Sequence, residues 1–308
     1  GAFRPPGGEG TRAAMPAIGD PPLPVVQESK TAHGAPAPVS YVPAPLQREA
    51  ATGGPAKLRS SSGRKAEETR TCQLRVASIP NAAGSAYIEQ GRTKIIASVY
   101  GPRQVGERQQ QNQTDGSLLL DLQFAPFCSG TASREENEKR AVLYNSILRR
   151  ALESVVLLER YSKTAIDVNI MVLEDDGAVV TAALAAASLA LADARVEMRD
   201  LVAGATVHLA AGEGKDGTLL LDCSGEEERC MPEGSAVLHL GLCPARGALC
   251  LMHSAGPLPA APFEQMVLLA KETAEAVGAE MRRCLERRVE RRVAKRARSA
   301  GREEAQGA

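Results

Sequence analysis

Three consecutive carboxylates, Glu174, Asp175 and Asp176, are the residues of this sequence whose types and spacing best suit chemistry. They separate an alternating apolar segment, residues 165–173, from an Ala-rich run, residues 178–192, and these patterns predict a β-strand followed by an α-helix. Carboxylates at such a turn can bind a metal ion or act as a general acid or base. Asp176 can equally cap the helix, since an acidic side chain accepts hydrogen bonds from the free N–H groups of a helix start. These residues alone leave both alternatives open.

The cysteines and histidines predict neither a metal centre nor a disulfide framework. Four of the seven cysteines form two pairs with six residues inside each pair, whereas zinc sites usually have two to four. The odd, scattered set is typical of reduced thiols in an intracellular protein, packed in the core. The four histidines are far from one another in the chain. We therefore expect no metal and no cofactor. The cysteines are Cys72, Cys128, Cys223, Cys230, Cys243, Cys250 and Cys284.

The composition indicates a protein with a sizeable core and an uneven distribution of charge along the chain. The chain has 308 residues, 44% of them hydrophobic, and no net charge. Residues 69–281 carry 19 Lys or Arg against 27 Asp or Glu, whereas residues 282–302 carry 10 against two. The basic end suits a polyanion or an acidic partner, and a solvated helix end is the simpler alternative. The longest apolar run has 15 residues, too short for a membrane span, so no membrane partner is expected.

Three regions follow from the distribution of turn residues and apolar periodicity. Residues 1–57 contain 11 of the 19 prolines and little apolar pattern, which predicts a disordered Pro/Ala-rich arm over residues 1–58. Residues 59–281 form the folded domain, and residues 282–308 form a basic helix end and tail. The domain reads as a hairpin, a strand, a helix over residues 133–160, a strand, the Ala-rich helix, four more strands and a final helix that begins near Pro262. This order predicts an α+β or mixed α/β single domain.

Several segments resemble, in chain order, the RNase PH-like subunits that build the six-membered ring of the RNA exosome. Ser62-Gly63-Arg64 with Leu74-Arg75 is similar to the family's N-terminal signature. The block at residues 84–94, GSAYIEQGRTK, runs on to VYGPR, and the turn at residues 172–177 is followed by the Ala-rich helix. The resemblance covers residues 59–290 and is closest to the mRNA transport regulator 3 type. It implies an α+β, RNase PH-like fold of two β-α-β-β-α-type halves, with a mixed sheet and packed helices.

The resemblance also implies a reaction and its residues. Active members cut RNA from its 3′ end, because inorganic phosphate attacks the terminal phosphodiester and releases a nucleoside diphosphate. A pair of Asp six residues apart carries metal or acid work in the family; Asp176 occupies the second position, but Ile170 stands at the first. An alkyl side chain cannot carry a proton or bind a metal. We therefore expect a protein that is not an enzyme, with Asp176 as a vestige of the site.

Four arginines are the expected contacts with RNA or phosphate. Arg140 matches a phosphate-binding arginine of the family, and Arg134 is only near the second expected cation. Arg92 and Arg103 occupy hairpin and loop positions that face the central channel or the phosphate site in the family. Ordinary surface arginines are the alternative.

Three hypotheses for function follow. The first is a non-catalytic exosome ring subunit that supports 3′-to-5′ RNA processing and degradation, including rRNA processing, as scaffold and RNA channel. Its partners would be other RNase PH-like ring subunits, cap subunits and single-stranded RNA, and its location the nucleus, with the nucleolus, and the cytoplasm. The second is a phosphorolytic 3′-to-5′ exoribonuclease subunit of the rRNA-processing 41 type. The third is a free-standing adaptor with a basic helix.

Overall fold

The computed structural model describes residue 59 and residues 63–104, 115–128, 133–211 and 217–306, without the side chains of residues 261 and 295–306. These residues belong to one compact unit, residues 50–308. The predicted arm at residues 1–58 lies outside the described residues.

The first sheet has five strands in the order β1-β2-β3-β5-β4. Its neighbours are antiparallel except β4 and β5, which run parallel. Period-two alternation places one side of each inner strand in the core, as in β5, where Ile166, Val168 and Ile170 are buried. The strands are β1 (Cys72–Val76), β2 (Gly84–Gln90), β3 (Thr93–Gln104), β4 (Ser117–Phe124) and β5 (Thr164–Glu174).

The second sheet has four antiparallel strands in the order β7-β6-β8-β9. It is formed entirely by residues that follow the Ala-rich helix in the chain, so each half of the domain contributes its own sheet. The strands are β6 (Ala203–Ala210), β7 (Thr218–Leu221), β8 (Ala236–Cys243) and β9 (Ala248–Ala255).

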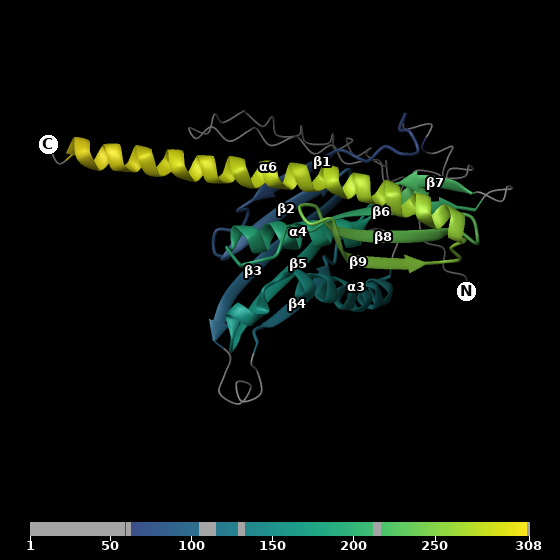
Figure 1. Cartoon of the computed structure of the whole chain (residues 1–308), viewed down its shortest axis with the longest axis horizontal. Helices are drawn as coiled ribbons and strands as arrows, with labels where there is room; N and C mark the ends of the chain where they lie inside the picture. Colours follow the sequence, from purple (N-terminus) through teal and green to yellow (C-terminus); the bar gives the residue numbers. More distant parts are fainter. Residues whose placement is uncertain (1–58, 60–62, 105–114, 129–132, 212–216, 307–308) are drawn as a thin grey trace, which may run out of the picture. The chain divides into compact units, whose positions relative to one another are not determined.

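The helices occupy the space between the sheets and the outer side of the second sheet (Figure 1). Helix α3 packs on β4 and β9, α4 packs on strands of both sheets, and α6 packs on β6, β8 and β1. The helices are α3 (Arg134–Val155), α4 (Val179–Asp193), α5 (Gly225–Arg229) and α6 (Ala260–Gln306), with a 3-10 turn at Leu158–Tyr161.

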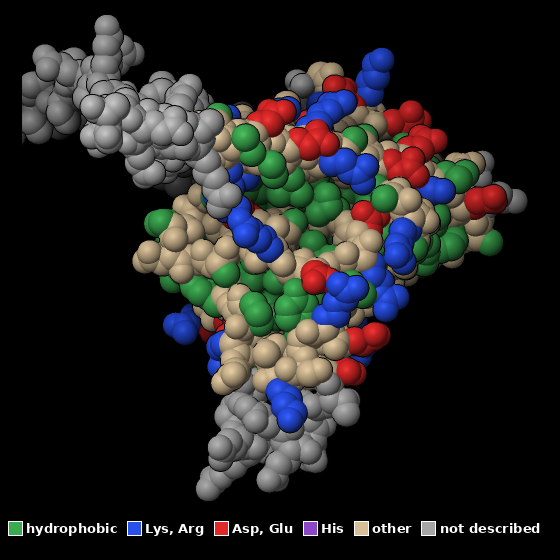
Figure 2. All heavy atoms as spheres, turned by 60° about the vertical axis from the view of Figure 1, so that its left-hand side comes forward, with side chains coloured by type: hydrophobic (Ala, Val, Ile, Leu, Met, Phe, Trp, Pro, Cys, Tyr) green, Lys and Arg blue, Asp and Glu red, His purple; other side chains and the backbone are tan. Residues whose placement is uncertain are grey.

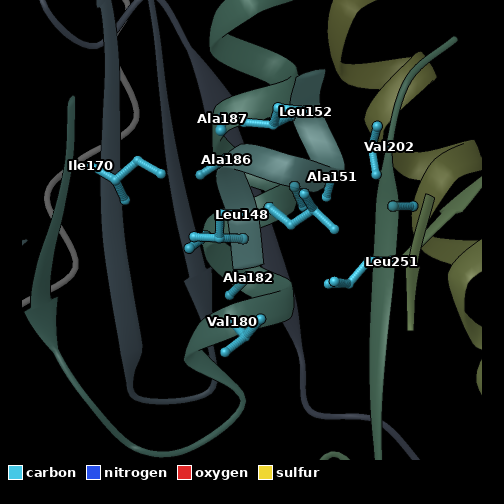
Figure 3. Close-up of a cluster of buried hydrophobic side chains, with 14 of the residues drawn as sticks. Leu148, Ala151, Leu152, Ile170, Val180, Ala182, Ala186, Ala187, Val202 and Leu251 are labelled. Atoms are coloured by element: carbon cyan, nitrogen blue, oxygen red, sulfur yellow. The ribbon is translucent and has the colours of Figure 1, made fainter. Parts of the chain in front are cut away.

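Helix α4 is the centre of the core. All its residues from Val179 to Leu191 are buried, and their small side chains let strands approach from both sides (Figure 3). The approach is closest at Gly84 of β2, where an added Cβ would lie 2.2 Å from the backbone nitrogen of Ala194. The α+β arrangement expected from the sequence is confirmed, since two sheets, one mixed and one antiparallel, enclose packed helices.

Helix α3 begins as expected and ends earlier. Ser133 forms a capping box with Glu136, which satisfies free N–H groups at the helix start. The helix ends at Val155, five residues before the expected end, because Val156 forms a bridge to Met198 and continues as extended backbone. Tertiary pairing therefore overrides the helical periodicity here.

Helix α6 crosses the predicted boundary at residue 281 without a break and continues into the basic segment. Arg288 and Arg292 of this segment approach Asp193 at the end of α4, at 3.5 and 3.4 Å. Among the described residues, no helix has both the length and the apolar character that a membrane span requires.

Candidate functional site

The three carboxylates of the β5–α4 turn point to three different partners. Glu174 pairs with Lys94 at 2.8 Å, and Asp175 pairs with Arg140 at 2.8 Å. Asp176 lies 3.4 Å from Arg70 and accepts a hydrogen bond from the backbone N–H of Gly225 at 3.1 Å. Each carboxylate of the turn is therefore neutralised by a different cationic side chain. In the described part of the chain, no group of three His, Cys, Asp or Glu residues is arranged to hold a metal ion.

Asp176 does not cap α4, which corrects one of the alternatives drawn from the sequence. The helix begins at Ala178, in the left-handed region with φ of 55°, and it has no side-chain cap. The Asp176 side chain points instead to the start of α5 and to Arg70. Burial raises the pKa of Asp176 above its ordinary value, against the attraction of Arg70 and Arg92.

Arg70 joins this turn to the second half of the domain. Its guanidinium donates to Asp222 Oδ1 at 2.6 Å and to the Asp176 carbonyl oxygen at 2.5 Å, and its backbone N–H donates to Asp222 Oδ2 at 2.8 Å. Burial on its own would raise the pKa of Asp222, but the hydrogen bonds and charge of Arg70 hold that pKa below the ordinary value. The Arg70–Asp222 pair is therefore a buried ion pair that fixes the turn.

A cavity of about 360 Å³ lies at the start of α4. Its walls include the backbone of residues 177–179, Arg140 and Tyr144 of α3, His208 of β6, Glu228 of α5 and His239 of β8. The first N–H groups of a helix lack intrahelical partners and carry partial positive charge. The N-cap residue of α4 makes no side-chain hydrogen bond to the helix, so the positive helix end is available to the cavity. The guanidinium of Arg140 lines the same cavity. This combination suits an anion.

Arg140 is held rigidly at the cavity wall. Its guanidinium lies 5.0 Å from the Phe124 ring centre and 5.6 Å from that of Tyr144, besides its pair with Asp175. Burial opposes its charge, but Tyr144 and Asp175 raise the pKa of Arg140 above the ordinary value. Arg140 therefore stays protonated at every working pH.

Glu228 places a carboxylate at the same helix start. Its Oε1 accepts the backbone N–H of Ala178 at 3.3 Å and lies 3.4 Å from Nε2 of His208. A negatively charged group of this chain thus already stands where the cavity favours an anion.

The other three predicted arginines lie elsewhere. Arg92 directly precedes β3, and Arg103 lies near the end of the same strand. At strand spacing the two residues are about 35 Å apart. Arg92 is 3.8 Å from Glu174, and Arg103 pairs with Asp167 at 2.5 Å. Arg134 is exposed, pairs with Glu138 at 2.9 Å and lines a separate hollow of about 620 Å³ between β4 and α3. A shared role of the four arginines in RNA binding stays a prediction.

His208, Glu228 and His239 were not predicted from the sequence. Each histidine stands alone in its segment, and Glu228 is the last of three consecutive glutamates that read as a solvated helix start. The structure brings them together because β6 and β8 are neighbours and α5 returns to the start of α4. The capping-box spacing of Ser224 and Glu227 signals α5 itself, but nothing in it signals where Glu228 points.

Comparisons with known proteins give matches both in sequence and in fold. Residues 68–197 match the family described as "3′ exoribonuclease family, domain 1" (RNase PH). The chain is 37% identical to exosome complex component Rrp41 of Pyrococcus furiosus over 74% of this chain and 88% of the relative. It is 36% identical to the component of the same name from Methanopyrus kandleri, over 72% and 90%.

Solved structures share the fold at lower identity. Rice (Oryza sativa) Rrp46 matches with a TM-score of 0.59 and 23% identity, over 72% of this chain and 98% of the other. The Archaeoglobus fulgidus exosome with RNA bound to the active site matches with a TM-score of 0.60 and 20% identity, over 73% and 94%.

The prediction that this chain is not an enzyme is wrong, because it matches an exoribonuclease family and relatives that carry the Rrp41 name. The prediction relied on Ile170. Ile170 is 2% exposed and points into the core toward the helix that carries Ala182 and Ala186 (Figure 3). Its side chain is not part of the cavity wall. An alkyl group at this position therefore removes nothing from the cavity, and it carries no conclusion about activity.

Proposed function

This chain belongs to the RNase PH (3′ exoribonuclease) family, and from that premise we propose that it is a ring subunit of an RNA exosome and acts in 3′-to-5′ RNA processing. The cavity at the start of α4 is its phosphate site. The observation that carries this proposal is a buried helix start that its own N-cap side chain does not cap and that faces Arg140 across an accessible cavity.

The geometry supports phosphate because the reaction gathers negative charge. In phosphorolysis, inorganic phosphate approaches a phosphodiester that is itself charged, so binding needs fixed positive groups. The N–H groups of α4 and the guanidinium of Arg140 provide them in fixed positions, since both are held in place by packing. Glu228 would have to move away from the helix start when phosphate binds.

The outer face of the first sheet supports assembly with other subunits. Tyr100, Leu119 and Met171 lie on β3, β4 and β5, on the side that faces away from α4, and are 38%, 46% and 42% exposed. β4 is an edge strand, a position that can pair with another chain, although the Asn145 side chain bonds its backbone at Leu122. On the face drawn in Figure 2, hydrophobic side chains gather in the middle, with charged side chains around them. We propose other RNase PH-like ring subunits, cap subunits and single-stranded RNA as partners.

The experiment that tests this function compares Arg140→Ala with Arg149→Ala in rings assembled from the full chain and its neighbours. Both residues lie on α3, but Arg149 is 53% exposed, pairs with Glu153 and does not line the cavity. With RNA, phosphate and magnesium, Arg140→Ala should lower nucleoside diphosphate release about 10- to 100-fold. Arg149→Ala should leave it unchanged. Equal release from the two variants, at equal thermal stability, contradicts the proposal.

The finer type is a separate proposal. The block at residues 84–94 fits the mRNA transport regulator 3 type and the rRNA-processing 41 type equally well, and the named relatives carry the Rrp41 name. Co-purification with stoichiometry decides between them: a subunit of the former type should occur once per ring with five different relatives. A nuclear, nucleolar and cytoplasmic location also stays a proposal, and imaging of the full chain with and without residues 282–308 tests it.

A further inference from the structure

A single guanidinium is a weak holder for a doubly charged phosphate. Arg140 already shares its charge with Asp175 at 2.8 Å, and Glu228 adds a negative charge to the cavity. The residue expected from the sequence as a neighbouring cation, Arg134, lies in another hollow. The site therefore needs a second cation from elsewhere in the fold.

His208 has the placement of that cation. It is 7% exposed, it comes from the middle of β6, and it lines the same cavity as Arg140 and the start of α4. Its Nε2 is buried and has no hydrogen-bond partner among the residues that the structure describes. Glu228 Oε1 lies 3.4 Å away, near enough for attraction but outside hydrogen-bond geometry. A buried polar atom without a partner calls for an explanation, and a ligand in the adjoining cavity is one.

We infer that His208 is the second cationic group of the phosphate site: its imidazolium donates a hydrogen bond from Nε2 to a bound phosphate oxygen, beside Arg140 and the N–H groups of α4. This inference deepens the function proposed above and depends on it.

The charged and titratable groups that face His208 are Glu228 from α5, His239 from β8, and Arg140 and Tyr144 from α3. Burial, helped by His208 itself, lowers the pKa of His239 to about 4, so His239 stays neutral. Its Nδ1 is engaged with the hydroxyl of Thr206 at 3.0 Å. The Glu228 carboxylate, 3.4 Å from Nε2 of His208, is the group that attracts a positive charge on this side chain.

This role makes anion binding depend on pH. Histidine is the side chain that ordinarily changes charge between about pH 5 and 8. The imidazolium exists on the acid side of that change, so binding should weaken as the pH rises. A charge-assisted hydrogen bond is stronger than a neutral one, and its loss should weaken binding about tenfold.

The experiment is calorimetric titration of the full chain with sulfate from pH 5.5 to 8.5. Sulfate is a phosphate-sized dianion that keeps its charge over this range, so the slope reports the protein alone. The parent protein should lose about tenfold in affinity with rising pH, and His208→Gln should bind weakly with a flat profile. His208→Arg should recover affinity and also be flat. His253→Gln is the matched control, because His253 stacks on His239 but does not line the cavity; it should behave like the parent.

Two results overturn the inference in distinguishable ways. If Arg140→Ala binds sulfate as the parent does, the cavity is not the anion site and the proposed function loses its support. If Arg140→Ala weakens binding but His208→Gln keeps the parent's slope with pH, the site is correct and His208 is not its second cation.

Discussion

Replacing Arg70 by Met tests whether the buried ion pair with Asp222 holds the β5–α4 turn to the second half of the domain. Met keeps the unbranched, apolar stem of the side chain and removes the guanidinium that binds Asp222 and the Asp176 carbonyl. Asp222 is 2% exposed, so water cannot take the place of the guanidinium. The variant therefore leaves a carboxylate in the core with two remaining donors, the backbone N–H of residue 70 and the Gln90 side chain.

The expected loss in the free energy of unfolding is about 3 kcal/mol. Removing one partner of a buried ion pair costs about 3–5 kcal/mol, because the other charge stays buried without compensation. The low end applies here, since the hydrogen bonds to Asp222 from the backbone of residue 70 and from the Gln90 side chain survive. For a folded region of this size, each 1 kcal/mol lowers the midpoint of thermal unfolding by about 2–4 °C, so the midpoint should fall by about 6–12 °C.

The assay is urea and thermal unfolding of the full chain, followed by circular dichroism. Arg149→Met is the matched control: the chemical change is the same, but Arg149 is 53% exposed and pairs with Glu153 four residues along α3. It should cost less than about 0.5 kcal/mol.

A double variant tests more strictly whether the buried carboxylate causes the loss of stability. Adding Asp222→Asn to Arg70→Met should recover part of the lost stability, because the amide carries no charge and Asn tolerates the φ of 52° at this position. Equal stability of Arg70→Met and Arg149→Met, or a further loss in the double variant, would refute the idea of a stranded carboxylate.

Three other expectations concern packing, acid and assembly. Gly84→Ala should lower the free energy of unfolding by about 1–3 kcal/mol in urea, since its Cβ would lie 2.2 Å from the backbone of the α4 end; an unchanged midpoint contradicts the close approach. Asp222 has a folded pKa below its unfolded value, so its contribution is present above about pH 4 and is lost as the pH falls through the lowered pKa; Asp222→Asn should therefore show a flatter stability profile in acid, and a parallel profile speaks against it. The full chain alone should associate nonspecifically, and with two ring neighbours it should become monodisperse in ultracentrifugation, also without residues 1–58; a soluble monomer that does not bind its relatives contradicts this. A ring that carries Arg103→Glu and Arg140→Glu should protect RNA less than the parent ring, and full protection contradicts that.

Local structure was predictable because it depends on neighbouring residues. The strand, turn and helix at residues 164–193 follow from a change of apolar period, and the start of α3 follows from the capping box at Ser133. The parallel pairing of β4 with β5 was not predictable, since about 40 residues separate the strands and no local signal specifies the partner. The end of α3 was misplaced for a related reason: the bridge from Val156 to Met198 joins distant segments.

The site was predictable only where a motif marks it. Arg140 was found through the family pattern, and the structure places it in the cavity. His208 occupies one position of an alternating strand, where sequence gives a face but not what lies opposite. Ile170 was misread because a substitution in the sequence was taken as a loss from the site, whereas the side chain points into the core.

Helix α4 also determines how this protein unfolds. Both sheets bury their inner faces on the same helix, and its backbone is enclosed along nearly its whole length. Neither half can therefore melt while the other keeps its core, and the two sheets should unfold in one cooperative transition. The amides of α4 would exchange with deuterium through global opening, whereas those of the exposed part of α6 would exchange through local fraying.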